Sequence, residues 1–323
     1  LLKWDLKRGS SSTSARDVRI EFVEETLAEI EAIGTPISVV SILGPYRSGK
    51  SFTLNQLLPT DAKPDGANPF HVGHTVQPET EEVSVLIVPP CASPIEGVSL
   101  LVLDSPGLFA PNRAQIFDAQ LVAALNLVSN VVVYNSLGVI DRSSIEKLSL
   151  AVEAARAMAY LGDDADAADK SLSRPHLCFA LQNFHLQLKD LDGNELAPKQ
   201  WIEDMLATID IAHNSTSNFV EQFHSFFESL DVFPLPYPTH SLDDADHLDT
   251  LPPSAFTDKY TTRMEDMRRL VYTLAGQPKL IGALPMTGRI AANLIRSWTE
   301  SMNIPLGAST SFKNSAAILL DHL

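Results

Sequence analysis

The sequence predicts an α/β fold in which a mostly parallel central sheet is flanked by helices on both faces. Apolar segments of strand length alternate along the chain with segments of helical periodicity. Such alternation favours parallel strands joined by crossover helices. The segment at 37–43 is β-branched and apolar, which is typical of a strand buried on both sides. Ligands of such folds bind beyond the carboxyl ends of the strands.

Composition narrows the function classes. The 323 residues are 45% hydrophobic, enough for one large core. A net charge of −16 argues against binding nucleic acid or an anionic membrane through a basic face. The two cysteines, Cys91 and Cys178, suit a reducing compartment, and we expect a cytoplasmic location. The apolar window at 121–140 is interrupted by asparagine and serine, so it predicts a helix and then a strand rather than a membrane span.

Three segments are expected along the chain. Residues 1–16 are polar and predict a flexible lead-in or an edge segment. Residues 17–305 form the main domain, and 306–323 begin a further helical region. Proline and aspartate at 241–255 predict a mobile acidic loop. The periodicity predicts helices near 18–34, 52–58, 116–128, 143–161, 201–206, 219–230, 258–274, 287–301 and 311–323, and strands near 37–43, 83–88, 98–104, 130–135 and 177–181.

A phosphate-binding loop is predicted between the strand at 37–43 and the helix that follows it. Residues 44–51 fit the pattern G-x-x-x-x-G-K-[ST]. The alternative is an ordinary glycine turn, but a strand before and a helix after the loop favour an anion site at the helix N-terminus. Lys50 would reach the outer phosphates, and the Ser51 hydroxyl would hold Mg²⁺. The expected nucleotide contacts here are Gly44, Tyr46, Arg47, Ser48, Gly49, Lys50, Ser51 and Phe52.

A second loop with nucleotide-switch character follows the apolar run at 98–103. Asp104 ends this run, and Gly107 stands three residues later. A glycine at this place leaves a backbone N–H open to a γ-phosphate. An ordinary Pro-Gly turn is the alternative. The position of the loop, about 55 residues after the phosphate loop, favours the switch.

Four blocks together resemble the large GTPase domain of the guanylate-binding protein family, a dynamin-superfamily group related to the atlastins. They are Gly-Pro-Tyr-Arg-Ser-Gly-Lys-Ser at 44–51, Gly-His-Thr-Val-Gln at 73–77 with Thr80, Leu-Asp-Ser-Pro-Gly-Leu at 103–108, and Tyr-Asn-Ser-Leu-Gly at 134–138. The resemblance runs from about Leu27 to the C-terminus. It implies a P-loop NTPase fold that binds guanine nucleotide with Mg²⁺, hydrolyses GTP, and dimerises through the nucleotide face. GDP is the expected product, and whether GMP is also formed stays open.

The resemblance also implies roles for individual residues. Arg47 matches an internal arginine finger that stabilises charge on the transferring phosphoryl group; the alternative is a solvated loop arginine. Thr80 matches a switch threonine that meets Mg²⁺ and the γ-phosphate. Lys50 and Thr80 join Arg47 as catalytic residues, and Ser51 and Thr80 as metal ligands. Gln182 and Asn183 occupy the positions that read the base.

The sequence departs from the family pattern at three points. Asn183 replaces a base-reading aspartate, and an amide offers only one acceptor for the two guanine N–H groups, so guanine selectivity is open and adenine is an alternative. Pro78 stands in place of a serine near the attacking water, and Pro106 replaces an acidic residue. Neither proline side chain can orient a water.

The function that the four blocks favour is a GTPase domain that dimerises on binding nucleotide. The alternatives are a catalytically impaired scaffold with the same fold and a relative with altered base selectivity. The expected partners are guanine nucleotide and a second copy of the chain. Membrane or pathogen-surface targeting is expected only through regions outside this chain, and no nucleic-acid partner is expected.

Overall fold

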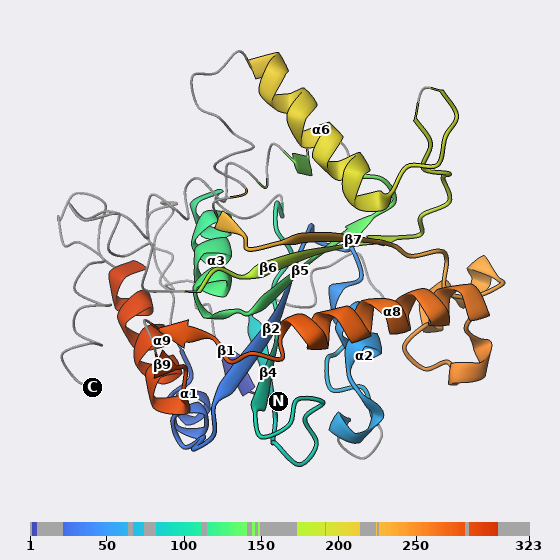
Figure 1. Cartoon of the computed structure of the whole chain (residues 1–323). Coiled ribbons are helices and arrows are strands. Elements are labelled where there is room, and N and C mark those ends of the chain that lie inside the picture. The colour runs from blue at the N-terminus through green and yellow to red at the C-terminus, as the bar shows by residue number, and fades with distance from the viewer. Residues whose placement is uncertain are drawn as a thin grey trace, which may run out of the picture.

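The computed structural model describes residues 2–4, 22–63, 67–73, 82–110, 115–140, 144–145, 148, 173–190, 192–213, 224, 226–281 and 284–302 (Figure 1). A seven-stranded sheet with the order β1-β3-β4-β2-β5-β6-β7 forms its centre. Strands β4, β2, β5, β6 and β7 are parallel, whereas β3 runs antiparallel to β4, and β1 antiparallel to β3. The strands are β1 (Leu2–Trp4), β2 (Ile37–Leu43), β3 (Val83–Val88), β4 (Ser99–Asp104), β5 (Val131–Leu137), β6 (His176–Gln182) and β7 (Leu230–Pro234).

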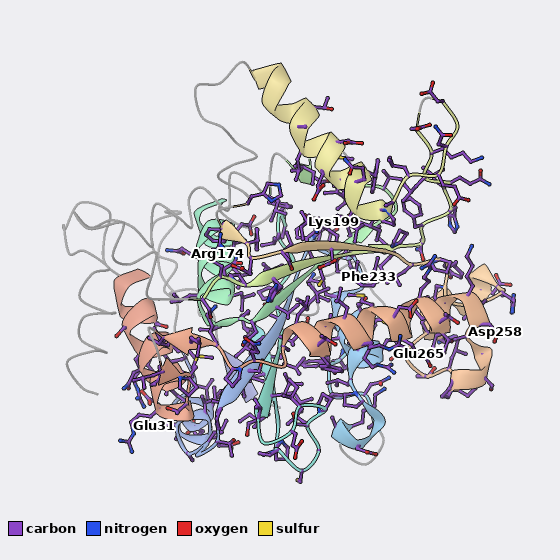
Figure 2. All side chains as sticks on the ribbon, in the orientation of Figure 1. Glu31, Arg174, Lys199, Phe233, Asp258 and Glu265 are labelled. Atoms are coloured by element: carbon purple, nitrogen blue, oxygen red, sulfur yellow. The ribbon has the colours of Figure 1, made fainter. Side chains whose placement is uncertain are left out.

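Two helical layers enclose the sheet, as predicted (Figure 1). Alternate strand residues point to opposite faces, and they divide between two apolar clusters: Val39 and Leu43 belong to one, Val40 and Ile42 to the other. The first cluster includes residues of α1 (Glu24–Glu31), α3 (Gln115–Val128), α6 (Pro198–His213) and α9 (Gly288–Met302). The second includes residues of α2 (Lys50–Leu57) and α8 (Asp258–Leu274). Figure 2 shows side chains filling these layers, while charged residues such as Lys199 and Glu265 lie on the outer helix surfaces.

Several predicted boundaries need correction. The first helix was expected from residue 18, but Val23 is an extended N-cap and α1 begins at Glu24, where two glutamates favour a helix start. The segment 241–255, expected to be a mobile acidic loop, contains two 3₁₀ helices, η3 (Leu242–His247) and η4 (Pro253–Ala255). The Ser241 side chain caps η3, and Asn68 binds the Asp249 carbonyl. Leu230, expected at the end of a helix, begins β7, which parallel pairing to β6 stabilises.

Other expectations are met or lie outside the described residues. The helix predicted at 258–274 has the bounds of α8, and the strand at 83–88 those of β3. A short hairpin, β8 (Leu280–Ile281) with β9 (Leu284–Pro285), and the 3₁₀ turn η1 (Thr60–Ala62) were not predicted. Residues 2–4 form the edge strand β1. Most of the helix expected at 143–161, and the segment 306–323, lie outside the described residues.

The C-terminal end of α3 is held by a buried lysine from the segment before β8. Lys279 is 1% exposed, and its Nζ donates to the carbonyls of Asn126, Ser129 and Ser173 at 3.3, 2.7 and 2.8 Å. The helix dipole favours a cation at this position, but burial lowers the pKa of Lys279 to about 7. The contact therefore joins α3 and the hairpin at some cost in desolvation.

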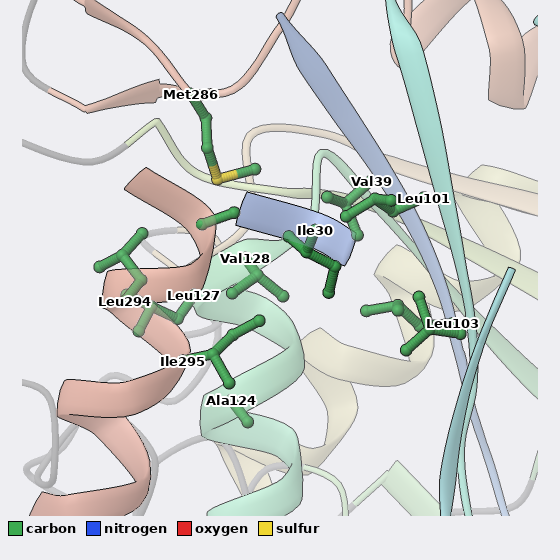
Figure 3. A pocket seen from close by; sticks show the side chains of 12 residues that line it. Ile30, Val39, Leu101, Leu103, Ala124, Leu127, Val128, Met286, Leu294 and Ile295 are labelled. Atoms are coloured by element: carbon green, nitrogen blue, oxygen red, sulfur yellow. The ribbon is translucent and has the colours of Figure 1, made fainter. Parts of the chain in front are cut away.

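One apolar cavity lies between α1, α3, α9 and the sheet. Figure 3 shows Ile30, Val39, Val128 and Leu294 pointing into it. Its volume is about 40 Å³, more than one water needs, but its walls offer almost no hydrogen-bond partners. The first core cluster is therefore incompletely packed here.

Among the described residues, the helices are too short or too polar to cross a membrane.

Candidate nucleotide-binding site

The phosphate-loop residues connect β2 to α2, as the pattern predicts. Gly44 adopts φ +149°, and a Cβ there would lie 2.0 Å from the Asn135 carbonyl oxygen of β5, so only glycine fits. Gly49, in the left-handed region at φ +81°, is the N-cap of α2. The N-terminal N–H groups of α2 are left without helical partners at this end. Loop and helix together form an anion-binding geometry.

Lys50 lies at the start of α2 with its amine folded back onto the loop. The residue is 7% exposed, and Nζ donates to the Pro45 carbonyl at 3.1 Å. Desolvation strengthens the attraction of an ammonium group for an anion. This placement suits a lysine that binds phosphate where the loop turns.

Ser51 and Asp104 meet where the phosphate loop approaches the end of β4. The Ser51 hydroxyl donates to Asp104 Oδ2 at 2.6 Å. Asp104 is 2% exposed, and its other oxygen, Oδ1, has no hydrogen-bond partner among the described residues. Burial raises the pKa of Asp104 to about 6, against the opposing effects of the Ser51 hydrogen bond and the Lys50 charge. A hydroxyl and a carboxylate with a free oxygen suit Mg²⁺, which prefers oxygen ligands.

The predicted switch loop is attached directly to the phosphate loop. Tyr46 N donates to the Leu108 carbonyl at 3.0 Å, and Leu108 N donates to the Gly44 carbonyl at 2.9 Å. A Cβ on Gly107 would lie 2.3 Å from Tyr46 Cα. Glycine at 107 therefore allows the two backbones to touch, a role that the sequence did not indicate.

Arg47 has a left-handed backbone with φ 66°. Its Nη1 donates to the Gly73 carbonyl at 3.1 Å, while Nη2 is buried and has no partner among the described residues. Gly73 immediately precedes 74–81, which lie outside the described residues and contain Pro78 and Thr80. The guanidinium therefore contacts the predicted switch segment, and the role of Thr80 stays a prediction.

Gln182, expected to contact the base, lies instead beneath the phosphate loop. It is 6% exposed, and its Nε2 donates to Thr53 Oγ1 and Asn135 Oδ1, both at 2.9 Å. Asn135 Nδ2 donates in turn to the Ser48 carbonyl at 2.5 Å. Asn183, the other predicted base contact, is half-buried with a left-handed φ of 57°. Its side chain makes no hydrogen bond within the described part of the chain.

Sequence reasoning missed Thr53 and Asn135 as parts of this site. The available signal was their polarity: Asn135 interrupts an apolar strand and Thr53 an apolar helix face, yet both are 0% exposed. Buried polar groups need hydrogen-bond partners, so such positions indicate a network. Asn135 lies in the block at 134–138, but no site role was assigned to that block.

The remaining loop residues differ in accessibility. Ser48 is 2% exposed, and Phe52 lies in the second core cluster with its ring 6.2 Å from that of Phe256. Phe52 can therefore offer a ligand its backbone N–H rather than its ring. Tyr46 is 37% exposed at the mouth of the site.

Comparison with known proteins agrees with this geometry. A family model described as "Guanylate-binding protein, N-terminal domain" matches residues 17–280. The chain is 26% identical to human guanylate-binding protein 4 over 304 residues, covering 91% of this chain and 46% of the relative. It is 28% identical to human guanylate-binding protein 5 over 289 residues, covering 87% of this chain and 48% of the relative. It is 26% identical to mouse guanylate-binding protein 3 over 289 residues, covering 86% of this chain and 45% of the relative.

The chain thus spans about half the length of the curated relatives it matches. The matched part includes β2 with the phosphate loop, β4 with Asp104, and the ends of β5 and β6. Since the family model covers most of the chain and the phosphate-loop geometry agrees with it, the chain belongs to the guanylate-binding protein family.

Proposed function

We propose that this domain binds guanine nucleotide with Mg²⁺ and hydrolyses GTP to GDP. The observation that carries the proposal is the Ser51–Asp104 hydrogen bond beside Asp104 Oδ1, which has no hydrogen-bond partner in the part of the chain that the structure describes. It brings the phosphate loop and the switch together at the carboxyl ends of adjacent parallel strands, where ligands of such sheets bind. Ser51 and Thr80 would hold the metal, with Asp104 nearby; Mg²⁺ would neutralise charge on the β- and γ-phosphates.

The chain's own residues supply the rest of the proposed reaction. Lys50 and the N-terminal N–H groups of α2 bind phosphate oxygens, and the Gly107 N–H lies in the loop that would meet the γ-phosphate. Arg47 would leave the Gly73 carbonyl to stabilise the transition-state charge, a contribution that can be large in phosphoryl transfer. Among residues within the described ranges, Asn183 is the proposed contact for the base.

Dimerisation through the nucleotide face is part of the proposal. Exposed apolar side chains border the site at the ends of neighbouring strands: Tyr46 after β2, Leu137 and Val139 at β5, and Leu186 after β6, with exposures of 37, 53, 42 and 63%. Exposed apolar residues gathered at one edge are typical of an interaction surface.

We also propose a cytoplasmic location, which suits the two free cysteines. Membrane or pathogen-surface targeting would belong to regions beyond this chain.

The test is γ-phosphate release as a function of protein concentration, with oligomeric state followed in the same samples. GTPase activity that rises per molecule with concentration, and falls by orders of magnitude in Arg47→Ala, supports the proposal. No phosphate release at concentrations where the nucleotide is bound would refute the catalytic part.

A second candidate, a nucleotide-binding scaffold without turnover, is favoured by Pro106. This residue is buried in the switch loop and offers no group to orient water. Turnover restored by Pro78→Ser would support the scaffold, whereas brisk turnover in the unmodified chain would exclude it. A third, altered base selectivity, rests on Asn183 and predicts ATP-analogue affinity equal to or above that for GTP analogues.

A further inference from the structure

Gln182 occupies a base-reading position in the sequence, but its side chain contacts the support of the phosphate loop. We propose that Gln182 is a positioning residue that orients the Asn135 amide and, through it, the peptide between Ser48 and Gly49. This inference rests on the proposed function, since the loop it orients is the proposed phosphate site.

The first step is the orientation of Asn135. Its Oδ1 accepts from Gln182 Nε2 at 2.9 Å and lies 3.0 Å from the Thr53 hydroxyl. The Thr53 hydroxyl has one hydrogen, which this oxygen shares with the Gly49 carbonyl, also at 3.0 Å. With the Gln182 amide donating to Oδ1, the Asn135 amide nitrogen must point the other way, and it donates to the Ser48 carbonyl. Loss of Gln182 would remove one of the two contacts that set this orientation.

The second step is the peptide itself. Peptide bonds in the described chain are trans, so the C=O of Ser48 and the N–H of Gly49 point in opposite directions. Because Asn135 holds the carbonyl on the β5 side, the Gly49 N–H points away from β5. A phosphate-cradling loop requires backbone N–H groups turned toward one anion. Asn135 therefore sets the direction of the Gly49 N–H donor, and Gln182 sets the orientation of the Asn135 amide.

The third step is the position of Gln182 at the start of the base-reading turn. Its carbonyl accepts from Gly138 N at 2.6 Å, and the chain then turns at the left-handed Asn183. The backbone of Gln182 thus helps to form the turn proposed to read the base, while its side chain supports the phosphate end. The two ends of the nucleotide site share this residue.

The test compares Gln182→Met with Asn183→Ala. Affinities are measured for Mg²⁺ complexes of a GTP analogue, an ATP analogue and tripolyphosphate, which has no base. In Gln182→Met we expect all three to weaken about 5- to 10-fold, the size of one lost hydrogen bond, with the GTP:ATP ratio unchanged. In Asn183→Ala the ratio should change while tripolyphosphate affinity stays the same. A changed ratio with unchanged tripolyphosphate binding in Gln182→Met would overturn the proposal.

Two further readouts separate positioning from general loss of structure. The Gly49 amide resonance should shift in Gln182→Met, and adding Gln182→Met to Asn135→Ala should weaken binding no further, because both act through one contact. If Gln182→Met does not fold, the same three affinities are measured in Gln182→Glu, and side-chain amide exchange is measured in the unmodified protein. The Gln182 side-chain amide should exchange slowly with solvent; rapid exchange would refute the network. If the unmodified protein binds none of the three ligands, the proposed function itself fails. If the unmodified protein binds them and the Gln182 variants bind them equally well, only this inference is refuted.

Discussion

Gly107→Ala tests whether the phosphate loop and the switch depend on their direct contact. The new Cβ would lie 2.3 Å from Tyr46 Cα and 2.4 Å from Tyr46 Cβ. Carbon atoms pack at about 3.5 Å or more, so the two backbones must separate by roughly 1 Å. The hydrogen bonds at 3.0 and 2.9 Å between Tyr46, Leu108 and Gly44 would then exceed hydrogen-bond distance.

Loss of these two hydrogen bonds should cost about 2 kcal/mol, which corresponds to about 30-fold in an equilibrium constant. The loss would appear in the affinity for a Mg²⁺–GTP analogue, in the free energy of unfolding, or divided between them. Equilibrium binding and urea unfolding measure both quantities. Binding within twofold of normal together with unchanged stability would show that neither the site nor the fold depends on this contact.

Gly34→Ala is the matched control for this experiment. A Cβ there meets no atom within 4 Å, and Gly34 is not in the left-handed region. The same chemical change should therefore leave nucleotide binding unaltered and stability equal or slightly higher, because alanine restricts the unfolded chain.

Three further predictions concern stability. Because burial lowers the pKa of Lys279 to about 7, the unfolded chain binds a proton that the native lysine has released at higher pH. Stability should therefore rise with pH from about 7 toward about 10.5, the ordinary pKa of lysine, by at most about 1.4 kcal/mol per pH unit. Lys279→Met should flatten this slope in urea unfolding; an unchanged slope would contradict it. Val128→Ile adds one methylene at the cavity of about 40 Å³ and should stabilise by about 0.8 kcal/mol, raising Tm by about 2 °C; a lower Tm would mean that the cavity cannot accept it. Arg268→Met removes side-chain donors to the Leu57 and Gln56 carbonyls at the end of α2 and should lower the free energy of unfolding by about 2 kcal/mol, whereas a loss below 0.5 kcal/mol would show that water replaces them.

The sequence predicted best the parts of the fold that depend on local pattern. The apolar run of β2, the glycines of the loop and the start of α2 stand together in the chain, and the bounds of α8 follow from its apolar periodicity and its Thr257 cap. Local chemistry fixed these elements, and tertiary packing agrees with it.

The errors arose where contacts distant in sequence decide the structure. The acidic segment 241–255 looked mobile because its charges cannot form a core, yet Asn68 holds the Asp249 carbonyl from a segment 181 residues away in the chain. β7 is a strand because β6 offers it a hydrogen-bonding edge. Neither partner could be found from the residues themselves.

For the site, the motif gave positions but not side-chain directions. Lys50, Ser51 and Asp104 lie together, as expected from neighbouring strand ends. Gln182 was assigned to the base because it stands at a base-reading position of the family pattern. The direction of its side chain depends on Thr53 and Asn135, which belong to other elements. Pairings of buried polar groups across elements are not determined by spacing.

The proposed function requires that Ser51 and Asp104 belong to a Mg²⁺–nucleotide site. The most direct test is calorimetric titration of a non-hydrolysable GTP analogue with and without Mg²⁺, in the unmodified protein and in Asp104→Asn. We predict that Mg²⁺ strengthens binding at least tenfold in the unmodified protein, and that this gain is largely lost in Asp104→Asn. Binding that is absent, or equally tight with and without Mg²⁺, would show that Ser51 and Asp104 do not form such a site.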